Sequence, residues 1–431
     1  MTDTTSRETV RAAPFAPLRS FLKAETTGGV LLVVGAVIAL VWVNLFPGSY
    51  HDLWETELGL SLGGRELSLT LHGWLNDGLM TLFFFVVGLE IKREIVQGEL
   101  RSPRAAALPI VGALGGMVVP ALLYTVFNAG TATSRGWGVP MATDIAMAVG
   151  VVTLIGRRFV PASLTVFLLA LAIADDLGAI IVIAVFYSES LDGLWLLAAL
   201  ALVAVTIGVR RLGIRPIPAY SILGVALWFS LHESGVHATI AGVVMGFIAP
   251  TKPLETPSAI AFGENEDLTD PEALQRHVAT SRHVISVVER LIHALLPWTS
   301  LVIVPVFAIA NAGIEIDGDV LGDTFGSSVA WGVLVGLVLG KPLGITLATF
   351  LAVKVGVAVL PQGVTWRQLA SVATVAGIGF TVAIFVADLA FVDESVLGAA
   401  KLGILVASVI AGLVGFVAVR ASGRSRLRSD A

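Results

Sequence analysis

The chain has 431 residues, of which 14% are charged and 56% hydrophobic, and its formal net charge is -5. A soluble domain carries about 25% charged residues, so this composition excludes an ordinary water-soluble enzyme, and it also excludes disorder, which requires low hydrophobicity. The sequence contains no cysteine, which excludes a disulfide scaffold and a thiol nucleophile, and the composition as a whole predicts a polytopic membrane protein.

Twelve apolar stretches approach the roughly 20 residues that a membrane-spanning helix needs. They cover residues 27–46, 73–92, 106–128, 136–156, 162–187, 193–209, 217–231, 235–250, 286–311, 328–352, 368–390 and 396–419. The first lacks a small-residue cleavage pattern behind it, so we interpret it as a retained helix and not a signal peptide. We expect an all-α membrane protein with about 12 transmembrane helices in a domain at 26–420, between tails at 1–25 and 421–431.

The basic residues predict the orientation. Only Arg65 and Arg135 lie in the connections that follow odd-numbered spans, whereas most of the 27 Lys and Arg residues lie in the two tails and the other connections. By the positive-inside rule, both termini are expected in the cytoplasm.

Two connections are longer than turns. Residues 58–70 alternate apolar with small or polar residues on both sides of Gly63-Gly64, which is typical of a β-hairpin with a primed turn. A lone hairpin is marginally stable in water, so we expect pairing with a second copy in a homodimer, while a solvated loop stays open as an alternative. The acidic connection at 251–283 is expected to be a flexible cytoplasmic loop.

Ionisable side chains inside the spans need an explanation, because a charge at the centre of a membrane helix costs about 2.5–3.5 kcal/mol. Three lie near span ends, where snorkelling to the membrane surface explains them: Glu90, Asp388 and Lys401. Five lie several residues from any end and are candidates for function: Asp77, Asp144, Asp175, Asp176 and Lys341.

Asp175 and Asp176 lie in the middle of an apolar span. Adjacent helical residues point about 100° apart, so one carboxylate can face a cation or water while the other faces a partner. Two neighbouring carboxylates repel each other, which favours protonation of one of them. Such a pair is suited to exchanging a proton for a cation.

Two spans contain residues that favour a break in the helix. Pro140, Thr143 and Asp144 lie in one of them, and Gly377–Thr381 lies in the other. Broken helices in corresponding positions of two halves point to the ion site of a transporter. Leu-Gly follows both Asp176 and Lys401, so we expect spans 3–5 to recur as spans 10–12 in an inverted repeat.

Opposed broken helices bring positive N-termini and negative C-termini together at mid-membrane. Asp144 and Lys341 have the signs needed to compensate these helix ends, and Lys341 could instead pair with one of the acids.

Seven motifs in one order make the chain similar to the NhaA-type sodium/proton antiporters. The resemblance covers about residues 26–420 and is carried by Leu75-Asn76-Asp77, Phe84–Glu94, Ala142–Ala146, Ala174–Gly178, Gly235–Thr239, Gly340–Gly344 and Gly377–Thr381. It implies a bacterial inner-membrane protein that exports Na+ and Li+ in exchange for external protons, electrogenically, with no cofactor. It also agrees with dimer formation through an outer hairpin.

The resemblance assigns roles to particular residues. Asp176 matches the principal cation and proton carboxylate, with Asp175 beside it and Thr143 and Asp144 nearby, so Asp175 and Asp176 are the expected Na+ and Li+ ligands. Lys341 and Asp77 are expected to support the site by compensating charge. Candidates for pH sensing are Glu90, Glu94, His237, Glu289 and His293.

The pH-sensing region departs from the family's pattern. The family often has a Glu-His step at the start of span nine, but here Ile292 precedes His293, and Glu289 is the candidate substitute one helical turn earlier.

An enzyme is disfavoured, because the motifs of intramembrane aspartyl proteases and of Asp-rich prenyl transferases are absent from the sequence. A cation channel and a sodium-coupled symporter stay open as alternatives. The expected partners are Na+, Li+, H+ and the lipid bilayer, and no nucleic acid is expected.

Overall fold

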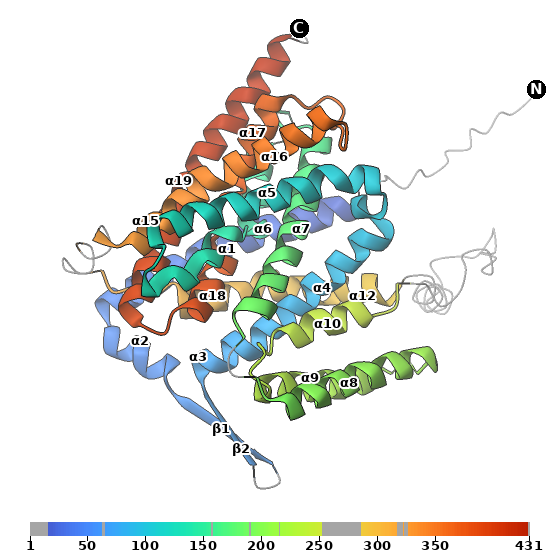
Figure 1. The fold of residues 1–431 in the computed structure, drawn as a ribbon, viewed down its shortest axis with the longest axis vertical. Helices are drawn as coiled ribbons and strands as arrows, with labels where there is room; N and C mark the ends of the chain where they lie inside the picture. Colours follow the sequence, from blue (N-terminus) through green and yellow to red (C-terminus); the bar gives the residue numbers. More distant parts are fainter. Residues whose placement is uncertain are drawn as a thin grey trace, which may run out of the picture.

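The computed structural model describes residues 16–429 except 63–64, 157, 189–190, 215, 252–285, 317–321 and 323–325. The predicted acidic loop therefore lies outside the described residues from 252 onward, as does the predicted N-terminal tail before residue 16. The described chain is mostly helical with one two-stranded sheet, so the predicted fold class is confirmed at this level (Figure 1).

The helices follow one another along the chain with short connections. The first half contains α1 (Ala16–Leu45), α2 (Pro47–Trp54), α3 (Leu71–Gly73), α4 (Met80–Gln97), α5 (Pro103–Asn128), α6 (Ile145–Ile155), α7 (Ala162–Phe186) and α8 (Gly193–Arg211). The second half contains α9 (Ile217–Glu233), α10 (Ile240–Ile248), α12 (Val287–Trp298), α13 (Val304–Asn311), α15 (Ser328–Val335), α16 (Lys341–Val355), α17 (Trp366–Val375), α18 (Phe380–Ala390) and α19 (Glu394–Ser429). Helix α19 continues through most of the predicted C-terminal tail.

Several of these helices adjoin tighter or wider turns. The 3-10 segments are η2 (Glu99–Arg101) and η3 (Ala132–Met141), and the π segments are η1 (Trp74–Leu79), η5 (Thr299–Ile303) and η6 (Gly336–Gly340). Pro305 and Pro342 each begin a helix directly after a π segment. Proline cannot donate a backbone hydrogen bond, so the wider turn before it accommodates the missing bond.

Each of the twelve predicted stretches contains helix, but fewer meet the length and apolarity of a span. Among the described residues, eight helical segments do so, and the pair α17 and α18, bent by 52°, makes a ninth. Helices α9 and α10 have only 17 and 9 residues, and α4 carries four charged residues near its end. The number twelve therefore stays a prediction.

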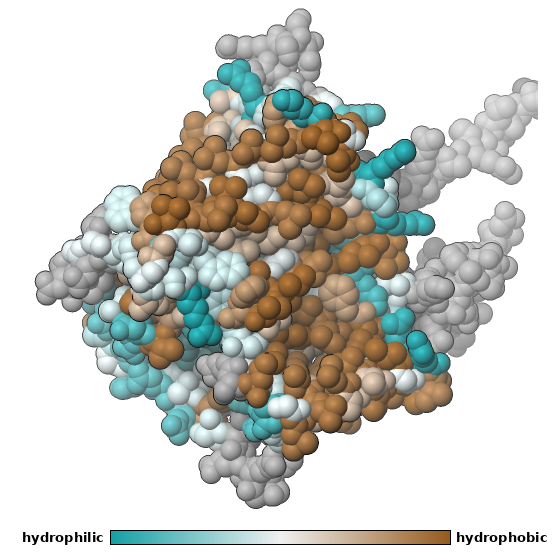
Figure 2. Space-filling model, viewed as in Figure 1, coloured by the Kyte–Doolittle hydropathy of each residue, from teal (hydrophilic) through white to brown (hydrophobic). Residues whose placement is uncertain are grey.

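Apolar side chains cover much of the outside of the bundle. In Figure 2 they form a broad brown band across the face, with hydrophilic residues gathered toward its margins. The outer side of α8 is typical: Leu194, Leu197 and Leu200 are each at least 60% exposed. Water does not tolerate so large a contiguous apolar surface on a monomer, so this surface faces lipid.

The predicted β-hairpin is present. Strands β1 (Glu57–Leu62) and β2 (Arg65–Thr70) pair antiparallel, in a register that runs from Glu57 opposite Thr70 to Leu62 opposite Arg65. The two predicted turn glycines lie outside the described residues. The hairpin projects away from the helices in Figure 1 and is attached at its base, where the Trp74 indole N–H donates to the Leu58 carbonyl at 2.9 Å.

A close crossing of α5 and α16 positions one side of the functional region. A Cβ added to Gly344 would lie 2.1 Å from the Gly115 carbonyl oxygen, and one added to Gly115 would lie 2.3 Å from the Gly344 carbonyl oxygen. Only glycine fits at such a contact between backbones. Lys341, one turn before Gly344, is thereby held against the centre of the bundle, where α7 runs (Figure 1).

Candidate functional site

Two interruptions of regular helix meet inside the bundle. The first is at 142–144, between η3 and α6, and the second is at 376–379, between α17 and α18. The backbone N–H of Asp144 donates to the Ile378 carbonyl at 2.7 Å, which joins the two breaks directly. Both breaks were predicted from their Pro, Thr and Gly residues, whereas the contact between them was not.

Asp144 connects the N-termini of two helices. Its Oδ1 accepts the Met147 backbone N–H at 3.0 Å, as the cap of α6. Its Oδ2 accepts the backbone N–H and the hydroxyl of Thr381, in the first turn of α18, at 3.2 and 2.6 Å. A carboxylate is favoured at the positive N-terminal end of a helix, and here one carboxylate serves two. Both of its oxygens are occupied, which leaves Asp144 a supporting position.

Asp175 on α7 is paired with the buried lysine. Lys341 Nζ lies 2.7 Å from Asp175 Oδ2 and also donates to the Met141 carbonyl, which ends η3. Lys341 and Asp175 are 0% and 1% exposed. Of the two roles considered for Lys341, the pairing with an acid is the one observed, and its contact with Met141 also satisfies a helix-terminal carbonyl.

Thr143 lies between Asp175 and the second break. Its hydroxyl is 2.7 Å from Asp175 Oδ2 and 3.0 Å from the Ala376 carbonyl oxygen. A hydroxyl has one hydrogen to donate, so these two acceptors compete for it. The state of Asp175 is thereby linked to the position of the break that precedes α18.

Asp176 differs from its neighbour in having no positive partner in the described structure. It is 5% exposed, and its Oδ1 has no hydrogen-bond partner, as is also true of Asp175 Oδ1. Buried polar atoms are nearly always paired, and each exception calls for an explanation. A bound proton or a hard cation, which prefers oxygen ligands, would satisfy these oxygens.

A multi-ligand metal centre is not part of this arrangement. In the stretches of chain that the structure describes, no group of three or more His, Cys, Asp or Glu side chains is placed to hold a metal ion. A cation bound here would rely on two carboxylates and on carbonyl or hydroxyl oxygens, such as those at the breaks. That set suits a monovalent ion that must also leave.

The other predicted residues lie outside this cluster. Asp77 Oδ2 is 3.4 Å from His232 Nδ1 and the pair is about one quarter exposed, so Asp77 contacts α9 and not the crossing of the breaks. His237 Nε2 is 2.9 Å from the Tyr187 carbonyl oxygen.

The candidates for pH sensing on α4 and α12 are near one another. Glu90 is buried, and Glu94 and Glu289 lie within electrostatic reach of it. Glu94 Oε2 accepts the Glu99 N–H at 3.0 Å, and Glu289 Oε1 lies 3.4 Å from His293 Nε2. Glu289 and His293 thus contact each other one turn apart, as the substitution for the Glu-His step requires.

Snorkelling is the wrong interpretation of two of the three span-end residues. Lys401 Nζ lies 2.8 Å from Asp388 Oδ1, and the two side chains are 10% and 9% exposed. They point into the bundle because each offers the other a counter-charge. Glu90 is also buried and does not reach the surface.

Thr381 and the carbonyls of Met141, Ala376 and Ile378 were missed as site groups. The only signal for Thr381 was its place directly after the glycine-rich break, and the carbonyls carry no side-chain signal.

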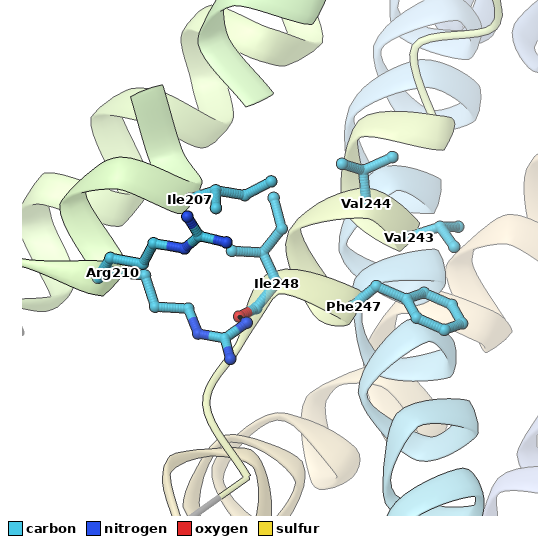
Figure 3. A pocket seen from close by; sticks show the side chains of 7 residues that line it. Ile207, Arg210, Val243, Val244, Phe247 and Ile248 are labelled. Atoms are coloured by element: carbon cyan, nitrogen blue, oxygen red, sulfur yellow. Dashed lines mark hydrogen bonds between the residues drawn. The ribbon is translucent and has the colours of Figure 1, made fainter. Parts of the chain in front are cut away.

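A cleft of about 390 Å³ lies elsewhere, between α8 and α10 (Figure 3). It is lined by Ile207, Arg210, Arg211, Val243, Val244, Phe247 and Ile248. Arg210 donates to the Ile248 carbonyl at 2.9 Å, and Lys92 donates to the carbonyls of Phe247 and Ala249. These cations cap the negative C-terminus of α10, so the cleft is distinct from the carboxylate cluster.

Comparisons with known proteins agree with this geometry. The profile of a family described as Na+/H+ antiporter 1 matches residues 19–419. The Na(+)/H(+) antiporter NhaA of Oleidesulfovibrio alaskensis is 47% identical over 429 residues, covering 95% of each chain. That of Wolinella succinogenes is 42% identical over 437 residues, covering 96% of this chain and 95% of the relative.

A solved structure has the same overall fold. The sodium proton antiporter MjNhaP1 from Methanocaldococcus jannaschii, at pH 8, aligns with a TM-score of 0.51 and covers 95% of this chain and 98% of its own. Its sequence identity is 12%, so the likeness concerns the fold alone.

Proposed function

Because the chain belongs to the Na+/H+ antiporter 1 family, we propose that it exchanges internal Na+ or Li+ for external H+ at Asp175 and Asp176. The observation that carries this assignment is the pair of buried carboxylate oxygens without partners, Asp175 Oδ1 and Asp176 Oδ1. No cofactor is required, since the transported ions are themselves the ligands.

Competition for the same carboxylates couples the two ions. Lys341 supplies the counter-charge of Asp175, whereas Asp176 lacks one. A buried charge without a partner is costly, so Asp176 holds either a proton or a cation. High proton concentration then releases Na+, and low proton concentration favours its binding. Electrogenic exchange, with two protons entering per Na+ leaving, would use Asp175 as the second proton site when Na+ is absent.

Movement between inward-facing and outward-facing states would pivot at the joined breaks. In transporters with inverted repeats, substrate sites lie near mid-membrane where discontinuous helices meet. We propose that spans 3–5 and 10–12 form such a repeat, within twelve spans in total. The hydrogen bonds from Asp144 to Ile378 and Thr381 would then join one repeat to the other.

The proposed location is the bacterial plasma membrane with both termini cytoplasmic. The distribution of basic residues supports this orientation, because only Arg65 and Arg135 lie in the connections assigned to the outer side.

The hairpin is proposed to form a homodimer contact, since a two-stranded sheet has unpaired edges and is marginal alone. Deleting residues 58–70 is therefore expected to reduce the dimer fraction several-fold while leaving most of the transport rate per folded protein. The dimer fraction is measured in native-like lipid by crosslinking or single-molecule photobleaching. A dimer fraction equal to that of the intact chain would contradict this contact.

The exchange itself is tested in everted membrane vesicles that carry the chain in a host lacking its own antiporters. After a proton gradient has been established, Na+ or Li+ is expected to dequench a pH-sensitive dye, and K+ is not, at pH values between about 6 and 9, which bracket carboxylates of raised affinity for protons. Uncoupled Na+ conductance would indicate a channel instead, and Na+ uptake that requires an organic solute would indicate a symporter.

A further inference from the structure

The Asp388–Lys401 ion pair lies inside the bundle and has no part in the exchange proposed above. Lys401 belongs to α19 and Asp388 to α18, and both side chains are about nine-tenths buried. Their 2.8 Å contact is one between charges and not an aligned hydrogen bond. Apolar residues of similar size are often as stabilising as a buried ion pair. Stability alone is therefore a weak explanation, and a role in fixing geometry is a stronger one.

A second contact holds the other end of α18 to the same helix. The Phe380 backbone N–H, at the start of α18, donates to Ser408 Oγ at 3.3 Å. Residues seven apart lie on one face of a helix, two turns from each other, so Lys401 and Ser408 share a face of α19. That face contacts the first turn of α18 through Ser408 and the last turns through Lys401. Together the two contacts determine both the position and the tilt of α18.

The first turn of α18 and the break before it reach the carboxylates directly. Thr381 donates twice to Asp144, and the Ala376 carbonyl competes with Asp175 Oδ2 for the Thr143 hydroxyl hydrogen. A tilt of α18 would lengthen the first contacts and change the second. It would therefore alter the oxygen environment of Asp175 without any change in the carboxylates themselves.

We propose that Asp388 and Lys401 are positioning residues for the Na+ site, acting through the placement of α18 on α19. Neither residue touches the ion. The inference rests on the proposed function, because it concerns the affinity of that site for Na+.

The test uses the full chain in everted vesicles, with a neutral pair, Asp388→Leu with Lys401→Met, and a reversed pair, Asp388→Lys with Lys401→Asp. The neutral pair is expected to fold normally but to raise the apparent KM for Na+ about tenfold, which corresponds to about 1.4 kcal/mol, with a smaller change in maximum rate. The reversed pair is expected to restore most of the affinity. Asp393→Asn is the matched control, since Asp393 is an exposed cap of α19 five residues along the chain.

A second readout separates this inference from the proposed function. Na+-dependent thermal stabilisation of the purified protein reports ion binding without transport. Normal exchange and an unchanged KM in the folded neutral pair would overturn the positioning role while leaving the proposed function intact. Loss of folded protein in both variants, with normal KM in what remains, would show a merely structural pair. A wild-type chain with neither Na+-driven exchange nor Na+-dependent stabilisation would overturn both.

Discussion

Replacing Asp176 by Asn is expected to abolish Na+-driven proton movement in everted vesicles while leaving the protein folded. An amide of nearly the same shape fills the same space, but it carries no negative charge and holds no exchangeable proton in this pH range. Both competing ions therefore lose their shared ligand. Residual exchange is expected to lie below the detection limit of the dye assay.

The stability of this variant distinguishes loss of the site from loss of the fold. Asp176 Oδ1 is buried without a partner, and removing an unsatisfied buried charge is neutral or stabilising. The melting temperature without Na+ should therefore equal or exceed that of the wild type, and the increase caused by Na+ should vanish. Asp192→Asn is the control, because Asp192 caps α8 from an exposed position and Asn retains a capping oxygen. Near-normal exchange by Asp176→Asn would disprove the assignment.

The fold was predictable where its signals are local. Apolar length predicts helices, and alternation around two glycines predicts the hairpin at 58–70, because each pattern is contained in consecutive residues. The number of full spans was less accessible, since α9 and α10 are shorter than a lone membrane helix would be. The π segments before Pro305 and Pro342 were not predicted, because they depend on how neighbouring helices pack.

For the candidate site, the sequence predicted the members but not most of the contacts. Asp144, Asp175 and Lys341 stand out because a charge within a span is expensive. The 2.7 Å contact between Asp175 and Lys341 joins residues 166 positions apart, and no local pattern encodes such a pairing. Thr381 was missed because a threonine in an apolar helix is ordinary. Proximity to span ends suggested snorkelling for Lys401, since its counter-charge on α18 is visible only in three dimensions.

Replacing Lys341 by Met is expected to cause the largest loss of stability, about 3–5 kcal/mol, which is the usual cost of leaving one member of a buried ion pair alone. Both side chains are at most 1% exposed, so water cannot solvate the remaining Asp175 carboxylate. The measurement is the fraction of protein that stays folded after heating in detergent, and the melting temperature should fall by several degrees. Asp175→Asn with Lys341→Met should recover most of that loss, because the uncompensated charge is removed.

Lys354→Met is the matched control for this substitution, on the last turn of the same helix, where the lysine is exposed. A cation at that end of a helix contributes only about 0.3–1 kcal/mol, so the control should melt close to the wild type. If Lys341→Met and Lys354→Met melted at the same temperature, the Asp175–Lys341 contact would not stabilise the fold. If the double variant were no more stable than Lys341→Met, the loss would come from packing around Lys341 and not from its charge. Recovery in the double variant alone assigns the loss to the pair, and it leaves Asp176 as the one acid in the cluster whose charge only a transported ion can balance.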